Sequence, residues 1–151
     1  MAMQDSPSAF SACDRVASGS ASFLLLVARV IFGFLFLQAG YYKLMGIAGT
    51  TGYLTNLKVP APDIMSWIVG LFELLSGTAL ILGLATRYVS LAMFIFVIIA
   101  TALAHRYWEY PAAQVGAQWN NFVKNLAIMG GALALFVTGA GSISVDAKMK
   151  K

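Results

Sequence analysis

Ionisable residues stand within or at the ends of long apolar segments, and they are the side chains of this sequence that could do chemistry. They are Arg29, Lys43, Glu73, His105 and Lys124. An ionisable group inside a membrane costs roughly 2.5 to 3.5 kcal/mol, so such groups usually face a bundle interior or a cavity and have a function there. Donors together with a carboxylate suit the binding of a polar group and the transfer of a proton.

Helical spacing indicates which face each charge occupies, because residues three, four and seven apart share one side of a helix. The predicted stripes are Arg29, Gly33, Phe36, Gly40 and Lys43; Ser66, Gly70, Glu73 and Gly77; Lys124, Ala127, Gly131, Ala134 and Thr138; and a weaker one of Phe94, Ile98, Thr101 and His105. Small residues mark faces where membrane helices pack closely. The stripes therefore predict that the charges point inward.

The depth of the charges predicts an interaction among them. At about 1.5 Å per residue, Arg29 and Lys124 bracket Glu73 in depth. An ion pair or triad through Glu73 would make these charges tolerable. Two interpretations stay open: the cluster fixes the register of the bundle, or it forms a site. His105, at a helix end, is also typical of a solvated histidine.

The elements that must position these residues are four apolar segments. Each is long enough to cross about 30 Å of hydrocarbon, and they cover about residues 22–42, 64–84, 88–105 and 118–138. The chain is 60% hydrophobic and 11% charged, with a mean hydropathy of +0.79, whereas soluble domains carry about 25% charged residues. The sequence predicts an all-α integral membrane protein, a four-helix antiparallel bundle over residues 22–142.

The connections predict the shape of the bundle. Residues 85–87 make a tight turn, with Gly83 as a helix C-cap and Thr86 as the next N-cap. Residues 46–62, rich in glycine and ending in two prolines, predict an outer interfacial or re-entrant segment, followed by Asp63 as a cap. Residues 1–21 are expected to be a mobile tail, and residues 143–151 a basic tail.

Composition also excludes classes of site and partner. One cysteine, Cys13, and one histidine cannot ligate an iron–sulfur cluster or a structural zinc, and bis-histidine haem is excluded too. We expect no metal site and no covalently bound cofactor, and Cys13 to be an incidental thiol. The basic residues are scattered singly, which is not the pattern of a nucleic-acid binder. The partner that composition does indicate is the lipid membrane.

The distribution of basic and aromatic residues predicts an orientation. The side of the termini holds Arg15, Arg87, Lys148, Lys150 and Lys151, the opposite loops hold Lys58 and Arg106, and Lys43 lies at the boundary. This bias favours cytoplasmic termini. All three tryptophans, and every tyrosine except Tyr88, fall on the other half. They form either an interfacial belt or aromatic walls for a flat ligand.

The same residues carry a family resemblance. The motifs are Arg29…Gly33…Phe36…Gly40-x-x-Lys43-Leu44, Gly52-Tyr53-Leu54, Val59-Pro60-Ala61-Pro62, Glu73-x-x-x-Gly77, Leu82-Gly83-Leu84-Ala85-Thr86-Arg87, His105, Lys124-Asn125-Leu126 and the glycines near the C-terminus. In this order they resemble the DoxX family of small bacterial membrane proteins, over about residues 24–146. The resemblance implies a multi-pass protein of the bacterial inner membrane, and adds Asn125 to the characteristic polar positions.

The resemblance also implies a link to redox chemistry. DoxX and the related DoxD are named for a thiosulfate:quinone oxidoreductase. Quinone reduction needs donors at two carbonyls and a route for protons, which the polar cluster would supply. The first hypothesis is therefore a quinone-binding or quinone-linked subunit, with Arg29, Lys43, Glu73, His105, Lys124 and Asn125 as ligand-binding residues. It requires a redox partner subunit or a directly reducing substrate.

Two other functions stay open at this stage. A membrane anchor or assembly scaffold would use the polar cluster only to hold the helices together. A small-solute transporter would use a path formed by a homo-oligomer. Transporters often have broken helices within the membrane, and the prolines of this chain fall only in the loops and the tail, which argues against this function.

Overall fold

A computed structural model describes residues 9–149 of the chain, and every regular element in that range is helical. The elements are α1 (Ala9–Gly19), α2 (Ala21–Met45), α3 (Ile47–Asn56), α4 (Pro62–Leu82), α5 (Thr86–Ala104), the 3-10 helix η1 (Tyr107–Glu109), α6 (Ala112–Thr138) and α7 (Val145–Met149). Helices α2, α4, α5 and α6 are long and apolar enough to cross a membrane. The predicted all-α fold with four spans is confirmed.

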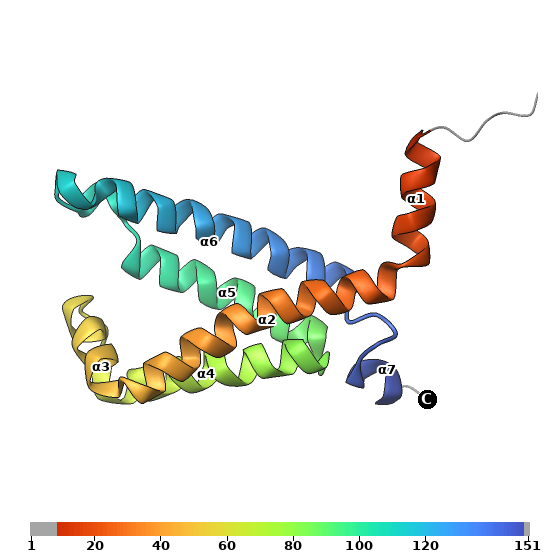
Figure 1. Ribbon diagram of the computed structural model, residues 1–151. Coiled ribbons are helices and arrows are strands. Elements are labelled where there is room, and N and C mark those ends of the chain that lie inside the picture. Colours follow the sequence, from red (N-terminus) through yellow and green to blue (C-terminus); the bar gives the residue numbers. More distant parts are fainter. Residues whose placement is uncertain (1–8, 150–151) are drawn as a thin grey trace, which may run out of the picture.

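The spans form two pairs, with α2 packed mainly on α4 and α5 mainly on α6 (Figure 1). Glycines bring α2 and α4 into backbone contact. A Cβ added to Gly40 would lie 2.6 Å from the carbonyl oxygen of Gly70, and one added to Gly77 would lie 2.6 Å from that of Gly33. The inward stripes predicted on these two helices are confirmed, since Arg29 and Glu73 are buried with those glycines.

The stripe predicted on α6 is wrong. Lys124, Ala127, Ala134 and Thr138 are exposed, and the buried residues of this helix are Asn125, Ala132 and Leu135. The buried face therefore lies about one residue further along the helix, and it includes a larger side chain, Leu135. On α5, Thr101 is buried as predicted, but Ile98 is exposed, and the buried line runs instead through Met93 and Val97.

The C-terminal segment closes one end of the bundle, termed here the α7 end. The Asp146 carboxylate accepts hydrogen bonds from the backbone N–H groups of Ala85, at 2.6 Å, and Thr86, at 2.9 Å. Gly83 ends α4 in the left-handed conformation, as predicted. The prediction that Thr86 caps α5 is wrong, because the distant Asp146 supplies that cap. Asp63 makes no cap either and lies in the first turn of α4.

The predicted tails contain helices, and their mobility stays a prediction. Helix α1 falls within the tail predicted over residues 1–21, and α7 falls within the predicted basic tail. Residues 1–8, Lys150 and Lys151 lie outside the described residues. At the opposite end of the bundle, termed the α3 end, helix α3 occupies the predicted interfacial segment and packs on α4. There the α2–α4 pair and the α5–α6 pair diverge (Figure 1).

Candidate functional site

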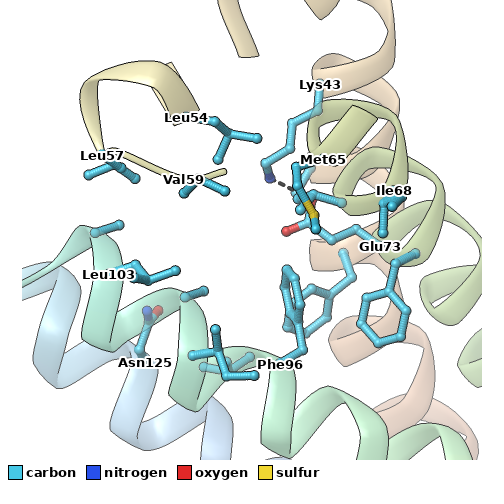
Figure 2. Close-up of a pocket in the computed structure, with 18 of the residues that line it drawn as sticks. Lys43, Leu54, Leu57, Val59, Met65, Ile68, Glu73, Phe96, Leu103 and Asn125 are labelled. Carbon is cyan, nitrogen blue, oxygen red and sulfur yellow. Dashed lines mark hydrogen bonds and ion pairs between the residues drawn. The ribbon is translucent and has the colours of Figure 1, made fainter. Parts of the chain in front are cut away.

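The divergence of the two helix pairs leaves a cavity of about 820 Å³ at the α3 end. Its walls come from α2, α4, α5 and α6, and Leu54 and Leu57 of the α3 segment border it (Figure 2). Most of the lining is apolar. The polar exceptions include five of the six predicted site residues, namely Lys43, Glu73, His105, Lys124 and Asn125. Ligand pockets usually have about this volume, with a few polar groups in an apolar wall.

An ion pair forms one polar wall of the cavity. Lys43 Nζ of α2 lies 2.5 Å from Glu73 Oε2 of α4. The Glu73 side chain is 7% exposed and that of Lys43 33%. Figure 2 shows the second carboxylate oxygen of Glu73 directed toward the open space. The pair arises because Gly40 and Gly70 let the two antiparallel helices approach closely. Lys43 begins beside Gly70, where an added Cβ would lie 3.6 Å from Lys43 Cβ, and its ammonium reaches Glu73 further along α4.

A buried amide forms the facing wall. Asn125 of α6 donates from Nδ2 to Thr101 Oγ1 at 2.8 Å, and the Thr101 hydroxyl donates to the Val97 carbonyl oxygen at 2.6 Å. This chain fixes the amide in place. An asparagine amide has two N–H donors, so one remains for a ligand. Figure 2 shows Asn125 across the open space from Lys43 and Glu73.

His105, at the end of α5, is oriented by a residue that the sequence analysis missed. Its Nδ1 lies 2.8 Å from Gln118 Oε1 of α6. Because an amide oxygen can only accept, Nδ1 is the donor in this contact, which holds the ring in place and leaves Nε2 for another partner. The signal in the sequence was the short link between the two helices, which brings residue 118 back beside residue 105. The solvated interpretation of His105 is thus incomplete.

The other polar groups of the lining include Lys124 and Tyr53. Lys124 is exposed and donates to Asn121 Oδ1 at 3.2 Å, so it does not join the ion pair of Glu73. Tyr53 of α3 also contributes to the lining. Its burial raises the pKa of the Tyr53 hydroxyl, and the nearby Tyr110 adds to the rise. The hydroxyl is therefore neutral at physiological pH and can donate a hydrogen bond.

Arg29 is the predicted site residue that the structure places elsewhere. It is fully buried at the α7 end, where it donates to the carbonyl oxygens of Leu80 at 3.1 Å, Ile81 at 3.2 Å and Ile143 at 2.6 Å. The predicted arrangement in which Arg29 and Lys124 bracket Glu73 is wrong. The guanidinium instead donates to two carbonyl groups in the last turn of α4 and to one in the C-terminal segment, and so ties that segment to α4.

A hydrophobic cluster separates the cavity from Arg29. Phe36, Leu80, Met93 and Val97 form this core, and Leu80 and Met93 are fully buried. The cavity is therefore closed toward the α7 end.

The predicted aromatic walls are found only in part. Tyr53 borders the cavity. Near η1, Tyr107 packs edge-on against Trp108 and Trp119, but these three residues do not belong to the lining of the cavity.

Comparison with known proteins places the chain in a family. The family model for DoxX matches residues 24–106, more than half of the chain. The chain belongs to the DoxX family. Inner membrane protein YphA of Escherichia coli is 37% identical over 124 residues, covering 82% of this chain and 88% of that protein. Inner membrane protein YqjF of the same species is 35% identical over 127 residues, covering 84% and 92%.

A third relative has a name that mentions an activity. CatD of Bacillus subtilis, named as a candidate oxidoreductase, is 34% identical over 64 residues, covering 42% of this chain and 46% of that protein. No solved structure matches the chain. The family match, the two relatives and the four apolar helices identify a multi-pass inner-membrane protein of the DoxX family. The cytoplasmic position of the termini stays a prediction.

Proposed function

We propose that this DoxX protein binds the headgroup of a quinone in its cavity and acts as the quinone-binding membrane subunit of a redox system. The observation that carries the proposal is the placement of donors on opposite walls of one largely apolar cavity. Lys43 stands on one wall and Asn125 on the other (Figure 2). A quinone has an apolar ring with a carbonyl oxygen at each end, and each oxygen would meet a donor.

The hydrogen-bonding capacity of these groups supports this geometry. An ammonium has three N–H donors, and Lys43 uses one on Glu73. Asn125 uses one of its two on Thr101. Both residues therefore keep a donor for a carbonyl oxygen while their existing bonds hold them in position. A fixed donor is favourable because little side-chain freedom is lost on binding.

Glu73 and His105 suit the proton transfers of the reaction. A quinone that takes up two electrons also takes up two protons to become a quinol, and it releases both when it is oxidised. Glu73 directs an oxygen toward the cavity, and His105 lines it. The electrons would come from a partner protein or a directly reducing substrate. The oxidoreductase name of CatD is consistent with such a role.

The test is the content of quinone in purified protein. We would purify the wild type and the Glu73→Gln variant in mild detergent, extract each, and quantify quinones and phospholipids by mass spectrometry. Glu109→Gln is the matched control, because Glu109 also pairs with a basic residue, Arg106 at 3.3 Å, but lies outside the cavity lining.

We expect near-stoichiometric quinone in the wild type and in the control, and a loss in a Glu73→Gln protein that stays folded. If quinone is no more enriched than bulk lipid in any of the three, the proposal is wrong. A membrane scaffold would then be the better hypothesis, and a stable partner should copurify.

A further inference from the structure

Several apolar side chains that line the cavity are about half exposed. Ile68 of α4 is 50% exposed, and Ile95 and Ile99 of α5 are 50% and 53% exposed. These three residues lie within the spans and come from the two helices that diverge (Figure 1). The gap between α4 and α5 therefore gives the cavity an apolar side within the membrane.

The course of the two helices explains this gap. Helices α4 and α5 are joined by a turn at residues 83–85 and separate with distance from it (Figure 1). The rings of Phe72 and Phe96 lie 5.0 Å apart and bridge the two helices about halfway along. Beyond this pair, toward the α3 end, Ile68 faces the cavity from α4 and Ile99 faces it from α5.

The other gap between the helix pairs, which lies between α2 and α6, has a different character. Near the α7 end it is filled, since a Cβ on Gly131 would lie 3.2 Å from the Phe32 ring. At the cavity it carries Lys124. A hydrocarbon chain would therefore find the wholly apolar route between α4 and α5, which we term the α4–α5 portal and define by Ile68, Phe72, Ile95, Phe96 and Ile99.

We infer that the α4–α5 portal admits the ligand from the bilayer and holds its hydrocarbon chain, so that the ligand is a long-chain, lipid-phase quinone rather than a water-soluble one. This inference rests on the proposed function. The side of the cavity toward α3 is covered by Leu54, Leu57 and Val59 (Figure 2). The polar groups thus hold the headgroup deep in the cavity, and the chain leaves through the portal into lipid.

Two alanines on α5 provide a matched pair of variants. Ala100 lines the cavity, whereas Ala102 is exposed and does not. A tryptophan at position 100 places an indole on the cavity side of α5, one turn from Phe96 of the portal. A tryptophan at position 102 adds the same bulk to the same helix on the lipid side. We would measure binding of a long-chain quinone and of its chain-free headgroup analogue to both variants in nanodiscs.

We expect Ala100→Trp to slow association of the long-chain quinone by about tenfold or more, while affinity for the chain-free analogue stays within about twofold of the wild type. Ala102→Trp should change neither. An equal loss of both ligands in Ala100→Trp would overturn the portal, because the indole would then be filling the headgroup site. Unchanged association of the long-chain quinone in that variant would overturn it as well.

Photolabelling locates the chain independently. A quinone with a diazirine at the end of its chain would be activated in nanodiscs, and the adducts mapped by mass spectrometry. Adducts on residues 68–72 and 95–99 that excess chain-free analogue removes support the portal. Competed adducts confined to residues 47–59 would refute it and leave quinone binding intact. Absence of binding of either quinone to the wild type would refute the proposed function itself.

Discussion

The Lys43–Glu73 ion pair offers a quantitative test, because its two partners differ in access to water. Replacing Lys43 by Met leaves the carboxylate of Glu73, whose side chain is 7% exposed, without its partner. Breaking a buried pair in this way costs roughly 3 kcal/mol or more. Replacing Glu73 by Leu leaves Lys43, whose side chain is 33% exposed and can reach water. We expect that change to cost only about 1 kcal/mol.

The double variant Lys43→Met with Glu73→Leu removes both charges and replaces them with apolar groups, so it should cost only about 1.5 kcal/mol. The two single costs sum to about 4 kcal/mol, which gives a coupling of about 2.5 kcal/mol between the side chains. The assay is reversible unfolding in mixed micelles of sodium dodecyl sulfate and a mild detergent, followed by circular dichroism.

Additive single effects, within about 0.5 kcal/mol, would show that the two side chains do not interact in the folded protein. A larger cost for Glu73→Leu than for Lys43→Met would contradict the difference in burial on which the reasoning depends. Either result would refute this account of the ion pair.

Three further predictions concern the frame around the cavity. Arg29→Met should lower the free energy of unfolding by about 3 kcal/mol because three carbonyl oxygens lose a donor. The quinone content per folded protein should still match the wild type, and a selective loss of quinone would contradict the separation of Arg29 from the site. Asp146→Ala should cost about 1 to 2 kcal/mol in the same unfolding assay because α5 loses its cap, and an unchanged stability would argue against that contact. Gly40→Ala should weaken the α2–α4 packing, since its Cβ would meet the Gly70 carbonyl, whereas Gly130→Ala, with nothing within 4 Å, should be neutral or stabilising; equal thermal stabilities would contradict the close approach.

The spans and the faces of α2 and α4 could be predicted from the sequence because local patterns determine them. Apolar length sets a span, and glycines at intervals of seven residues, at positions 33 and 40 and at 70 and 77, set a contact face. The same logic failed on α6. Small residues also occur where a helix faces lipid, as at Gly130, so their spacing alone does not separate a packed face from a free one.

The partners of the charges could not be predicted, because they depend on contacts between distant segments. Depth along the helices predicted that Arg29 lies near Glu73, whereas Arg29 binds carbonyl oxygens at the α7 end. The carbonyl oxygen of Ile143, which binds Arg29, reaches it only because the C-terminal segment folds back over the α7 end. The cap that Asp146 provides for α5 has the same origin. Neither contact leaves a pattern of adjacent residues.

The cavity itself could be predicted only in part. The convergence of Lys43, Glu73, His105 and Lys124 on the lining follows from their inward or rim positions on the four spans. Its volume and its opening between α4 and α5 depend on how far the helix pairs diverge. That divergence follows from the tight packing within each pair and the short turn that joins α4 to α5, and no single segment encodes it.

The most direct test of quinone binding between Lys43 and Asn125 is the infrared spectrum of a bound quinone with carbon-13 at its carbonyl groups. We predict that hydrogen bonds lower both carbonyl stretching frequencies relative to the same quinone in lipid. Lys43→Met should restore one band and Asn125→Leu the other, while Glu109→Gln should restore neither. Two bands at their lipid frequencies in the wild type, or shifted bands that both cavity variants leave unchanged, would contradict the proposed site.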